Sequence, residues 1–455
     1  MAERNVLDRR TFVKGMLAAG ATVTVAACAP VATPGAPAPA APVAPPTVTG
    51  PAWIHPKSLV RAQPGYGGAH LTWKYGDTVK WLPPEKYPAD AAADALARVP
   101  KAKLELCYYY TYLGRIWETT FRDIVLAGKD YVAPAVHSGG GEEAMGAAIP
   151  ILALNPDDYW KAHHRWHGGD MAKGKTTLAE ATTKSITVRD MTTHFMNKVQ
   201  EPTKAYGGFH IVDPKVGHLG IVGLIGLGPA LACGAAWACK VQKKGRIVGC
   251  FEGDGAQMGL YMFVNVRSAT NYKLPIFFGI DNNFQNMSMP VATITPSPYL
   301  ADFTTGLGIP TTVVDGNSVA AVYYACKEAA DRARAGDGPS MVEMLTWRHY
   351  DHAGWAGAKI GVDGAFGLPY RTDDEVRAWL GRDSVERYGT FLKDRGLFTQ
   401  AELDALKAKA RADMDDSVDF ARKGTYARPE DGCKGTWFGG GTQPATQFFE
   451  HAVIE

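Results

Sequence analysis

The sequence is poor in cysteine and in net charge. It has 7 cysteines among 455 residues, and its 48 basic residues nearly balance its 46 acidic ones, which leaves a formal charge of +2. So few cysteines exclude a small disulfide-stapled module, and the near-neutral charge gives no support for a nucleic-acid partner. An apolar fraction of 46% excludes an intrinsically disordered scaffold. The length allows one large domain with appendages, or two to three domains.

The first 28 residues have the pattern of a targeting segment. The pair Arg9-Arg10, within RRTFVK, precedes an apolar stretch from Met16 to Ala27 that is too short to span a bilayer. This order resembles a twin-arginine signal, a route that carries folded proteins. The segment VAAC, which ends at Cys28, resembles a lipoprotein cleavage box in which the cysteine is lipidated. We therefore expect an exported, periplasmic or otherwise extracytoplasmic chain that Cys28 tethers to a membrane.

Composition suggests how the rest of the chain is organised. Residues 29–52 are rich in proline and alanine and are expected to form an extended linker. The six cysteines beyond the signal form no CxxC pair, so no disulfide pairing follows from their spacing. The expected segments after the linker are an N-terminal extension at 53–102, an α/β domain at 103–372, helices at 373–429 and a glycine- and aromatic-rich tail at 430–455.

Hydrophobic periodicity in the central part predicts an α/β fold. Two short apolar runs with strand character are separated by a helical stretch, and the same order recurs further along the chain. Strand, helix and strand at this spacing form a βαβ unit, so we expect a parallel sheet flanked by helices. The expected strands are 246–251, 274–280, 310–314 and 340–346, and the expected helices are 103–128, 142–154, 217–239, 257–272 and 318–335.

Two short polar motifs follow the first two of these strands. Gly253-Asp254-Gly255 ends one strand and Asn282-Asn283 ends the next, with 26 residues between the motifs. In a βαβ unit both motifs lie at the carboxyl edge of the sheet, where ligands bind. Glycines let the backbone approach a phosphate, while carboxylate, amide and carbonyl oxygens suit Mg²⁺ held against phosphate oxygens. The spacing therefore predicts a site for a magnesium-bound phosphate compound.

This pairing, together with further motifs in a fixed order, resembles the α subunit of the thiamine diphosphate-dependent decarboxylating component of 2-oxo acid dehydrogenase complexes, of the pyruvate, branched-chain and acetoin types. The resemblance extends from about Leu104 to Gly424. It implies a thiamine diphosphate-binding fold with a helical C-terminal part. The motifs are HSGGGEEA from His137, HRWHG from His164, GIVG from Gly220, GDGA from Gly253, KLP from Lys273 and DNN from Asp281.

The resemblance assigns roles to individual residues. It implies that Asp254, Asn283 and the Gln285 carbonyl ligate Mg²⁺, and that His352 and His137 are catalytic. The remaining residues are implied to bind thiamine diphosphate: Arg165 and His164 at the diphosphate, Gly220 and Val222 through their backbone at the aminopyrimidine, and Gly253, Gly255 and Ala256 in the GDGA motif.

Several positions depart from the family pattern. Glu142 stands where the family has glutamine, and His164 where it has tyrosine. Tyr350 replaces the first histidine of the family's loop, unless a shift of one residue brings His349 into that role. His163, His164 and His167 could suggest zinc, but no cysteine or carboxylate set supports a closed zinc site. Ala353 replaces the serine after the loop histidine, so phosphorylation control is not expected there.

The leading hypothesis is an exported α-type subunit of a 2-oxo acid or acetoin dehydrogenase or decarboxylase. In that family the acid that contacts the aminopyrimidine belongs to a separate β subunit, so an α₂β₂ assembly is implied, with a small 2-oxo acid or acyloin as substrate. Two alternatives are a carboligase or transketolase-like half enzyme and a non-catalytic thiamine diphosphate-binding lipoprotein. A neighbouring gene for a β-type subunit favours either enzyme, and its absence favours the binding protein.

Overall fold

The computed structural model describes residues 79–82, 89–133, 136–199, 210–257, 259–291, 295, 299–354, 368, 371 and 373–428. All of them belong to one compact unit that comprises residues 46–455. The expected signal with Cys28, the 29–52 linker, most of the 53–102 extension and the 430–455 tail lie outside the described residues.

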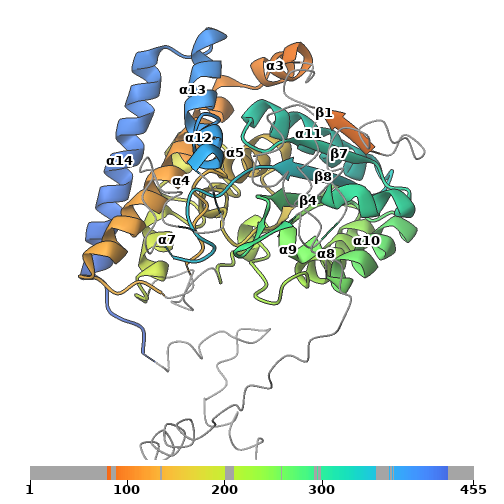
Figure 1. Cartoon of the computed structure of the whole chain (residues 1–455), viewed down its shortest axis with the longest axis horizontal. Coiled ribbons are helices and arrows are strands. Elements are labelled where there is room, and N and C mark those ends of the chain that lie inside the picture. Colours follow the sequence, from red (N-terminus) through yellow and green to blue (C-terminus); the bar gives the residue numbers. More distant parts are fainter. Residues whose placement is uncertain are drawn as a thin grey trace, which may run out of the picture. The chain divides into compact units, whose positions relative to one another are not determined.

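The centre of the unit is a parallel sheet of six strands in the order β1-β7-β8-β4-β3-β2 (Figure 1). Every neighbouring pair in this sheet is parallel, as the βαβ pattern predicts. A separate antiparallel pair, β5 (Gln285–Asn286) and β6 (Met289–Pro290), follows β4. The sheet strands are β1 (Val79–Leu82), β2 (Tyr159–Lys161), β3 (Val248–Gly253), β4 (Ile276–Asn282), β7 (Thr311–Asp315) and β8 (Ser340–Leu345).

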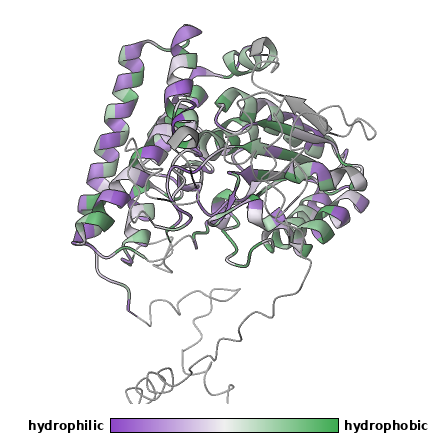
Figure 2. Cartoon of the chain, in the orientation of Figure 1, coloured by the Kyte–Doolittle hydropathy of each residue, from purple (hydrophilic) through white to green (hydrophobic). Residues whose placement is uncertain are grey.

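Helices cover both faces of the sheet, and successive side chains of β4 show this directly. Phe277 belongs to the apolar cluster formed with helices α4, α5 and α11, whereas Ile276 and Phe278 belong to the cluster formed with α8 and α10. Because both faces are buried, β4 is apolar from Ile276 to Ile280 rather than alternating, and Figure 2 shows the central strands largely in the hydrophobic colour. The covering helices are α4 (Lys101–Ala127), α5 (Glu143–Ala148), α8 (Gly228–Gln242), α10 (Leu260–Asn271) and α11 (Val319–Ala335).

The remaining helices surround this core. The C-terminal α14 packs along α4 and α7, and its outer side is largely hydrophilic in Figure 2. None of the helices in the described ranges is long and apolar enough to cross a membrane. Besides short 3₁₀ segments, these helices are α3 (Ala89–Ala97), α6 (His167–Ala172), α7 (Val188–Phe195), α9 (Asp254–Gln257), α12 (Asp373–Leu380), α13 (Ser384–Asp394) and α14 (Gln400–Lys423).

Most of the predicted elements are present within a few residues of their expected bounds. The predicted helix at 217–239 is wrong in its first half, because α8 begins only at Gly228 and the preceding loop uses φ of +74°, +81° and +78° at Gly217, Gly220 and Gly226. The helix expected through Leu154 ends as α at Ala148 and continues as a π-helical turn at 149–153. Strand β2 was not predicted, since its three residues carry no periodic signal.

Candidate active site

A cavity of about 270 Å³ lies at the carboxyl edge of the sheet. Its walls come from the segments that follow β2, β3, β4 and β8, together with the loop before α5 and the loop before α8. This is where an open α/β sheet binds its ligands. All of the predicted cofactor-binding and catalytic residues line this cavity except Gly220: His137, His164, Arg165, Val222, Gly253, Asp254, Gly255, Ala256, Asn283, Gln285 and His352.

The parallel pairing of β3 with β4 brings the predicted magnesium ligands together. Gly253 is in register with Asp281, so Asp254 and Asn283 follow neighbouring strand ends. The backbone N–H of Gln285 donates hydrogen bonds to Asp254 Oδ2 (3.0 Å) and to Asn283 Oδ1 (3.3 Å). Burial, with a further contribution from the charge of Asp281, raises the pKa of Asp254 to about 6. A carboxylate whose ionised form is destabilised in this way is stabilised by a nearby cation.

The glycines of the GDGA motif cannot be replaced by larger residues without a clash. A Cβ on Gly253 would lie 2.9 Å from His163 Nε2, and one on Gly255 would lie 2.6 Å from Asn286 Oδ1. Side chains of neighbouring loops fill the space beside these two Cα atoms, so both positions of the cavity wall require glycine. The carbonyl oxygen of the Gln285 side chain, Oε1, is buried there without a hydrogen-bond partner.

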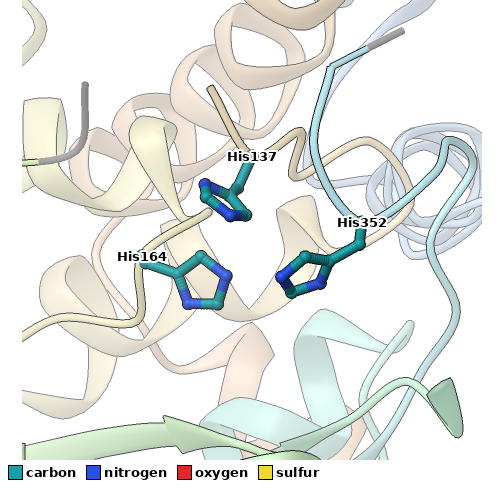
Figure 3. A group of neighbouring side chains, drawn as sticks. All are labelled: His137, His164 and His352. Carbon is teal, nitrogen blue, oxygen red and sulfur yellow. The ribbon is translucent and has the colours of Figure 1, made fainter. Parts of the chain in front are cut away.

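The side chains of His137, His164 and His352 lie close together (Figure 3). They belong to the segments that follow α4, β2 and β8, respectively. The ring of His137 lies 4.7 Å from that of His164 and 4.9 Å from that of His352, between ring centres. Burial and the charge of Arg165 lower the pKa of His352 to about 2. Burial and the neighbouring His163 lower the pKa of His164 well below its usual value. Both imidazoles are therefore neutral and can act as hydrogen-bond donors or acceptors.

Arg165 links this histidine group to the backbone. Its NH1 donates to the Ser138 carbonyl at 2.8 Å, and its NH2 lies 3.4 Å from His352 Nδ1. His349, the alternative loop histidine, is buried away from the cavity. Its backbone N–H donates to the Gly140 carbonyl at 2.7 Å, and its ring Nε2 lies 4.0 Å from Asp383. The structure thus places His352, and not His349, on the cavity wall.

Gly220 shapes the cavity without lining it. With a φ of +81°, it adopts a conformation that favours glycine. Its N–H donates to Nδ1 of His218 at 3.0 Å, so Nε2 of that ring carries the proton, which it donates to Asp170 Oδ1 at 2.9 Å. His218 and Asp170 are both fully buried. This chain of bonds holds the loop that brings Val222 to the cavity.

The structure also adds lining residues that the sequence motifs did not indicate: Lys161, His163 and Glu252. Lys161 Nζ donates to Glu252 Oε1 at 2.5 Å and to the Phe251 carbonyl at 3.0 Å, which forms a nearly buried ion pair. In the sequence, His163 stood out only as a member of a histidine cluster, and Glu252 as a charged residue at the end of an otherwise apolar strand. Such a residue is normally excluded from a buried strand unless it is paired.

The fold is an α/β fold with a cavity at the carboxyl edge of its parallel sheet. The profile of the dehydrogenase E1 component family matches residues 119–430. The α subunit of acetoin:2,6-dichlorophenolindophenol oxidoreductase from Cupriavidus necator is 31% identical over 344 residues, which cover 75% of this chain and 97% of the relative. Its counterpart from Bacillus subtilis is 30% identical over 64% of this chain and 81% of the relative.

A pyruvate dehydrogenase E1 component α subunit from Porphyra purpurea is 27% identical over 70% of this chain and 89% of the relative. The chain therefore belongs to the dehydrogenase E1 component family, which consists of thiamine diphosphate-dependent oxidoreductases. Membership confirms the family that the motif order indicated, as well as its α/β fold.

His218→Ala should weaken both the fold and the cavity. It leaves the Gly220 N–H and the Asp170 carboxylate buried with one partner fewer, which should cost about 1–3 kcal/mol of unfolding free energy. The displaced loop should bind thiamine diphosphate roughly tenfold more weakly, equivalent to about 1.4 kcal/mol. Denaturant unfolding and titration calorimetry measure the two effects.

The matched control is His167→Ala, which breaks a similar buried bond to Glu118 (2.7 Å) away from the cavity wall. It should lose stability but keep its affinity. Equal affinity losses in the two variants would show that His218 does not act through the loop.

Proposed function

We propose that the chain is the α-type subunit of an exported, thiamine diphosphate- and Mg²⁺-dependent dehydrogenase that acts on a small acyloin or 2-oxo acid. The observation that carries this proposal is the meeting of Asp254, Asn283 and Gln285 at the cavity wall, in a chain of the dehydrogenase E1 component family. An acyloin is the favoured substrate. Two relatives that are at least 30% identical over 81% or more of their own length are named as acetoin oxidoreductase α subunits.

The residues present fit the cofactor. Hard oxygen donors on Asp254 and Asn283 suit Mg²⁺, and the Gln285 carbonyl would complete the protein's share of its ligands. Arg165, almost fully buried, would pair with the diphosphate. The cavity of about 270 Å³ that these residues line would receive the phosphates. When bound, thiamine diphosphate supplies a carbon nucleophile and holds the electrons released as a bond at the substrate carbonyl carbon breaks.

The neutral histidines would serve the substrate end of the cavity. His352 has its Nδ1 near Arg165 and its ring beside those of His137 and His164. A neutral imidazole can donate a hydrogen bond to a carbonyl oxygen or hold a proton removed from a hydroxyl group. Its depressed pKa, about 2, means that it does not carry a permanent positive charge, so it would accept a proton only when negative charge develops beside it.

Asp254→Ala should abolish cofactor binding. The variant loses the one charged ligand of the magnesium site, and the diphosphate charge is then uncompensated. Thiamine diphosphate affinity in the presence of Mg²⁺ should fall more than roughly 100-fold, beyond the loss typical of residues that merely support a metal ligand. Asn283→Ala should act in the same direction but more weakly, because a neutral ligand is lost.

Titration calorimetry on the purified assembly measures this affinity, with Asp337→Ala, at an exposed surface position, as the control. Unchanged affinity in Asp254→Ala would refute the assignment of the cavity.

His352→Ala should separate catalysis from cofactor binding. We expect turnover of the substrate to fall about 10²–10⁴-fold, the range for a positioned acid–base group, while the affinity for thiamine diphosphate stays within a factor of about three. Steady-state kinetics and calorimetry on the same preparation supply both numbers. Activity within a factor of two of the unaltered enzyme would remove His352 from the reaction.

The site also needs a partner chain. Among the described residues that line the cavity, the acids are Glu252 and Asp254. Glu252 is paired with Lys161, and Asp254 is assigned to the metal. A third acid, to contact the aminopyrimidine, is therefore expected from a β-type subunit in an α₂β₂ assembly.

The surface next to the cavity fits such a partner. Helices α8 and α10 pack against each other and leave Trp237, Val241, Leu260, Phe263 and Val264 substantially exposed. Ile225, on the loop that lines the cavity, extends this apolar patch and is 71% exposed. An apolar patch of this kind marks a protein–protein interface.

Leu260→Glu should therefore prevent assembly. A carboxylate within the α8–α10 patch would have to lose its water on assembly, which costs free energy. A tagged chain should therefore no longer co-purify with the β-type subunit, and activity should be lost. Leu126→Glu, at an exposed apolar position on α4 (53% exposed), is the matched control and should retain both. Substrate turnover by the isolated chain alone would contradict the two-chain site.

Export completes the proposal. A cofactor bound in the cytoplasm must travel inside a folded protein, which is the cargo of the twin-arginine route. Replacing Arg9-Arg10 by Lys-Lys should block translocation, while Cys28→Ser should permit export but abolish lipid attachment. Cell fractionation and palmitate labelling distinguish these results, and a mature protein that retains Met1 in the cytoplasm would refute both.

A further inference from the structure

A second group of side chains that could hold a metal ion lies beside the cavity, and one of its members, His163, lines the cavity wall. Glu142 precedes α5, His163 follows β2, and Asp281 belongs to β4. Each is at most 2% exposed. One ligand atom from each of the three lies within 4.8 Å of those from the other two. The group therefore joins three elements that are distant in the sequence, and its members are distinct from the residues assigned to Mg²⁺.

With both carboxyl groups ionised, four polar atoms of this group have no hydrogen-bond partner: Glu142 Oε2, Asp281 Oδ1, His163 Nδ1 and His163 Nε2. Buried polar atoms of this kind are rare in folded proteins and call for an explanation. His163 Nδ1 lies 2.8 Å from Asp281 Oδ2 without the alignment of a hydrogen bond. Adjacent ligands of one octahedral ion with bonds of about 2.1 Å are about 3 Å apart, so this contact has the separation of two ligands that share a cation.

The charges of the group favour a cation as well. Two carboxylates are buried together, and the nearest cationic atom in an ion pair with Glu142 is Arg165 Nε, at 3.8 Å from Glu142 Oε2. An unpaired buried carboxylate is costly. The resemblance drawn from the sequence has a glutamine at this position, so the second acidic side chain is a property of this chain. A divalent ion would neutralise it and engage the free lone pairs.

We propose that Glu142, His163 and Asp281 bind a divalent transition-metal ion, of the Zn²⁺ or Mn²⁺ kind, separate from the Mg²⁺ of the cofactor. Two carboxylate oxygens with one imidazole nitrogen form a mixed set that suits such ions better than Mg²⁺, which prefers oxygen alone. The ion would also support the cofactor site, because Glu142 Oε1 accepts a hydrogen bond from Asn283 Nδ2 at 3.1 Å.

The group of His137, His164 and His352 is a less suitable metal site. Its ligand atoms are equally close together, but all three of its side chains are imidazoles, which offer no negative charge to offset that of a cation. No carboxylate belongs to that group. The two groups are separable by experiment, since they share no residue.

Cobalt(II) is the probe for this site, used on the purified assembly without thiamine diphosphate and with Mg²⁺ in large excess. The unaltered protein should bind one Co²⁺ per chain and show visible d–d absorption. X-ray absorption of this sample should show one imidazole ligand among oxygens. Glu142→Gln and His163→Gln should each lower Co²⁺ affinity at least roughly tenfold, as the loss of a ligand requires.

Glu118→Gln is the matched control, because Glu118 is another buried glutamate beside a histidine, with a 2.7 Å bond to His167. It should bind Co²⁺ normally. Absence of Co²⁺ binding by the unaltered protein would overturn the proposal, and so would a spectrum with three imidazoles or a loss of binding in His352→Gln alone. Because no readout uses thiamine diphosphate, failure here is distinguishable from failure of the proposed function.

Discussion

The parallel pairing of β3 with β4 is the constraint on which the site depends. Their register places Gly253 opposite Asp281, and from this follow the positions of Asp254, Asn283 and the loop that contains Gln285. A shift of one residue would turn these side chains to the opposite face of the sheet. The two apolar clusters that cover the sheet, with Phe277 on one side and Phe278 on the other, fix this register because each buries alternate residues of β4.

The second constraint is the distribution of charge at this edge. Burial lowers the pKa of His164 and His352, so these two imidazoles are neutral. The acids are gathered at the strand ends, where burial raises the pKa of Asp254. Such an edge is stabilised when the acids bind a cation and Arg165 pairs with an anionic group. The thiamine diphosphate–Mg²⁺ pair proposed for the cavity has this combination of charges.

The sequence predicted the sheet, its βαβ connections and most of the cavity wall, because strand periodicity and short glycine motifs are local signals. It did not predict β2 or the loop before α8. Strand β2 has too few residues to show a hydrophobic period. The loop before α8 is rich in apolar and small residues, which predicted a helix, but Gly220 and Gly226 adopt positive φ values there. The Glu142, His163 and Asp281 group was also missed, since its members approach one another only through tertiary packing.

The central claim is that the cavity at this edge holds thiamine diphosphate through a divalent cation. The most direct measurement is the thiamine diphosphate content of the unaltered assembly, purified from its own membranes and assayed before and after treatment with a chelator. The account predicts one cofactor for each α-type chain, lost with the chelator and regained with Mg²⁺. An assembly that contains none, and takes up none when Mg²⁺ and thiamine diphosphate are supplied, would contradict it.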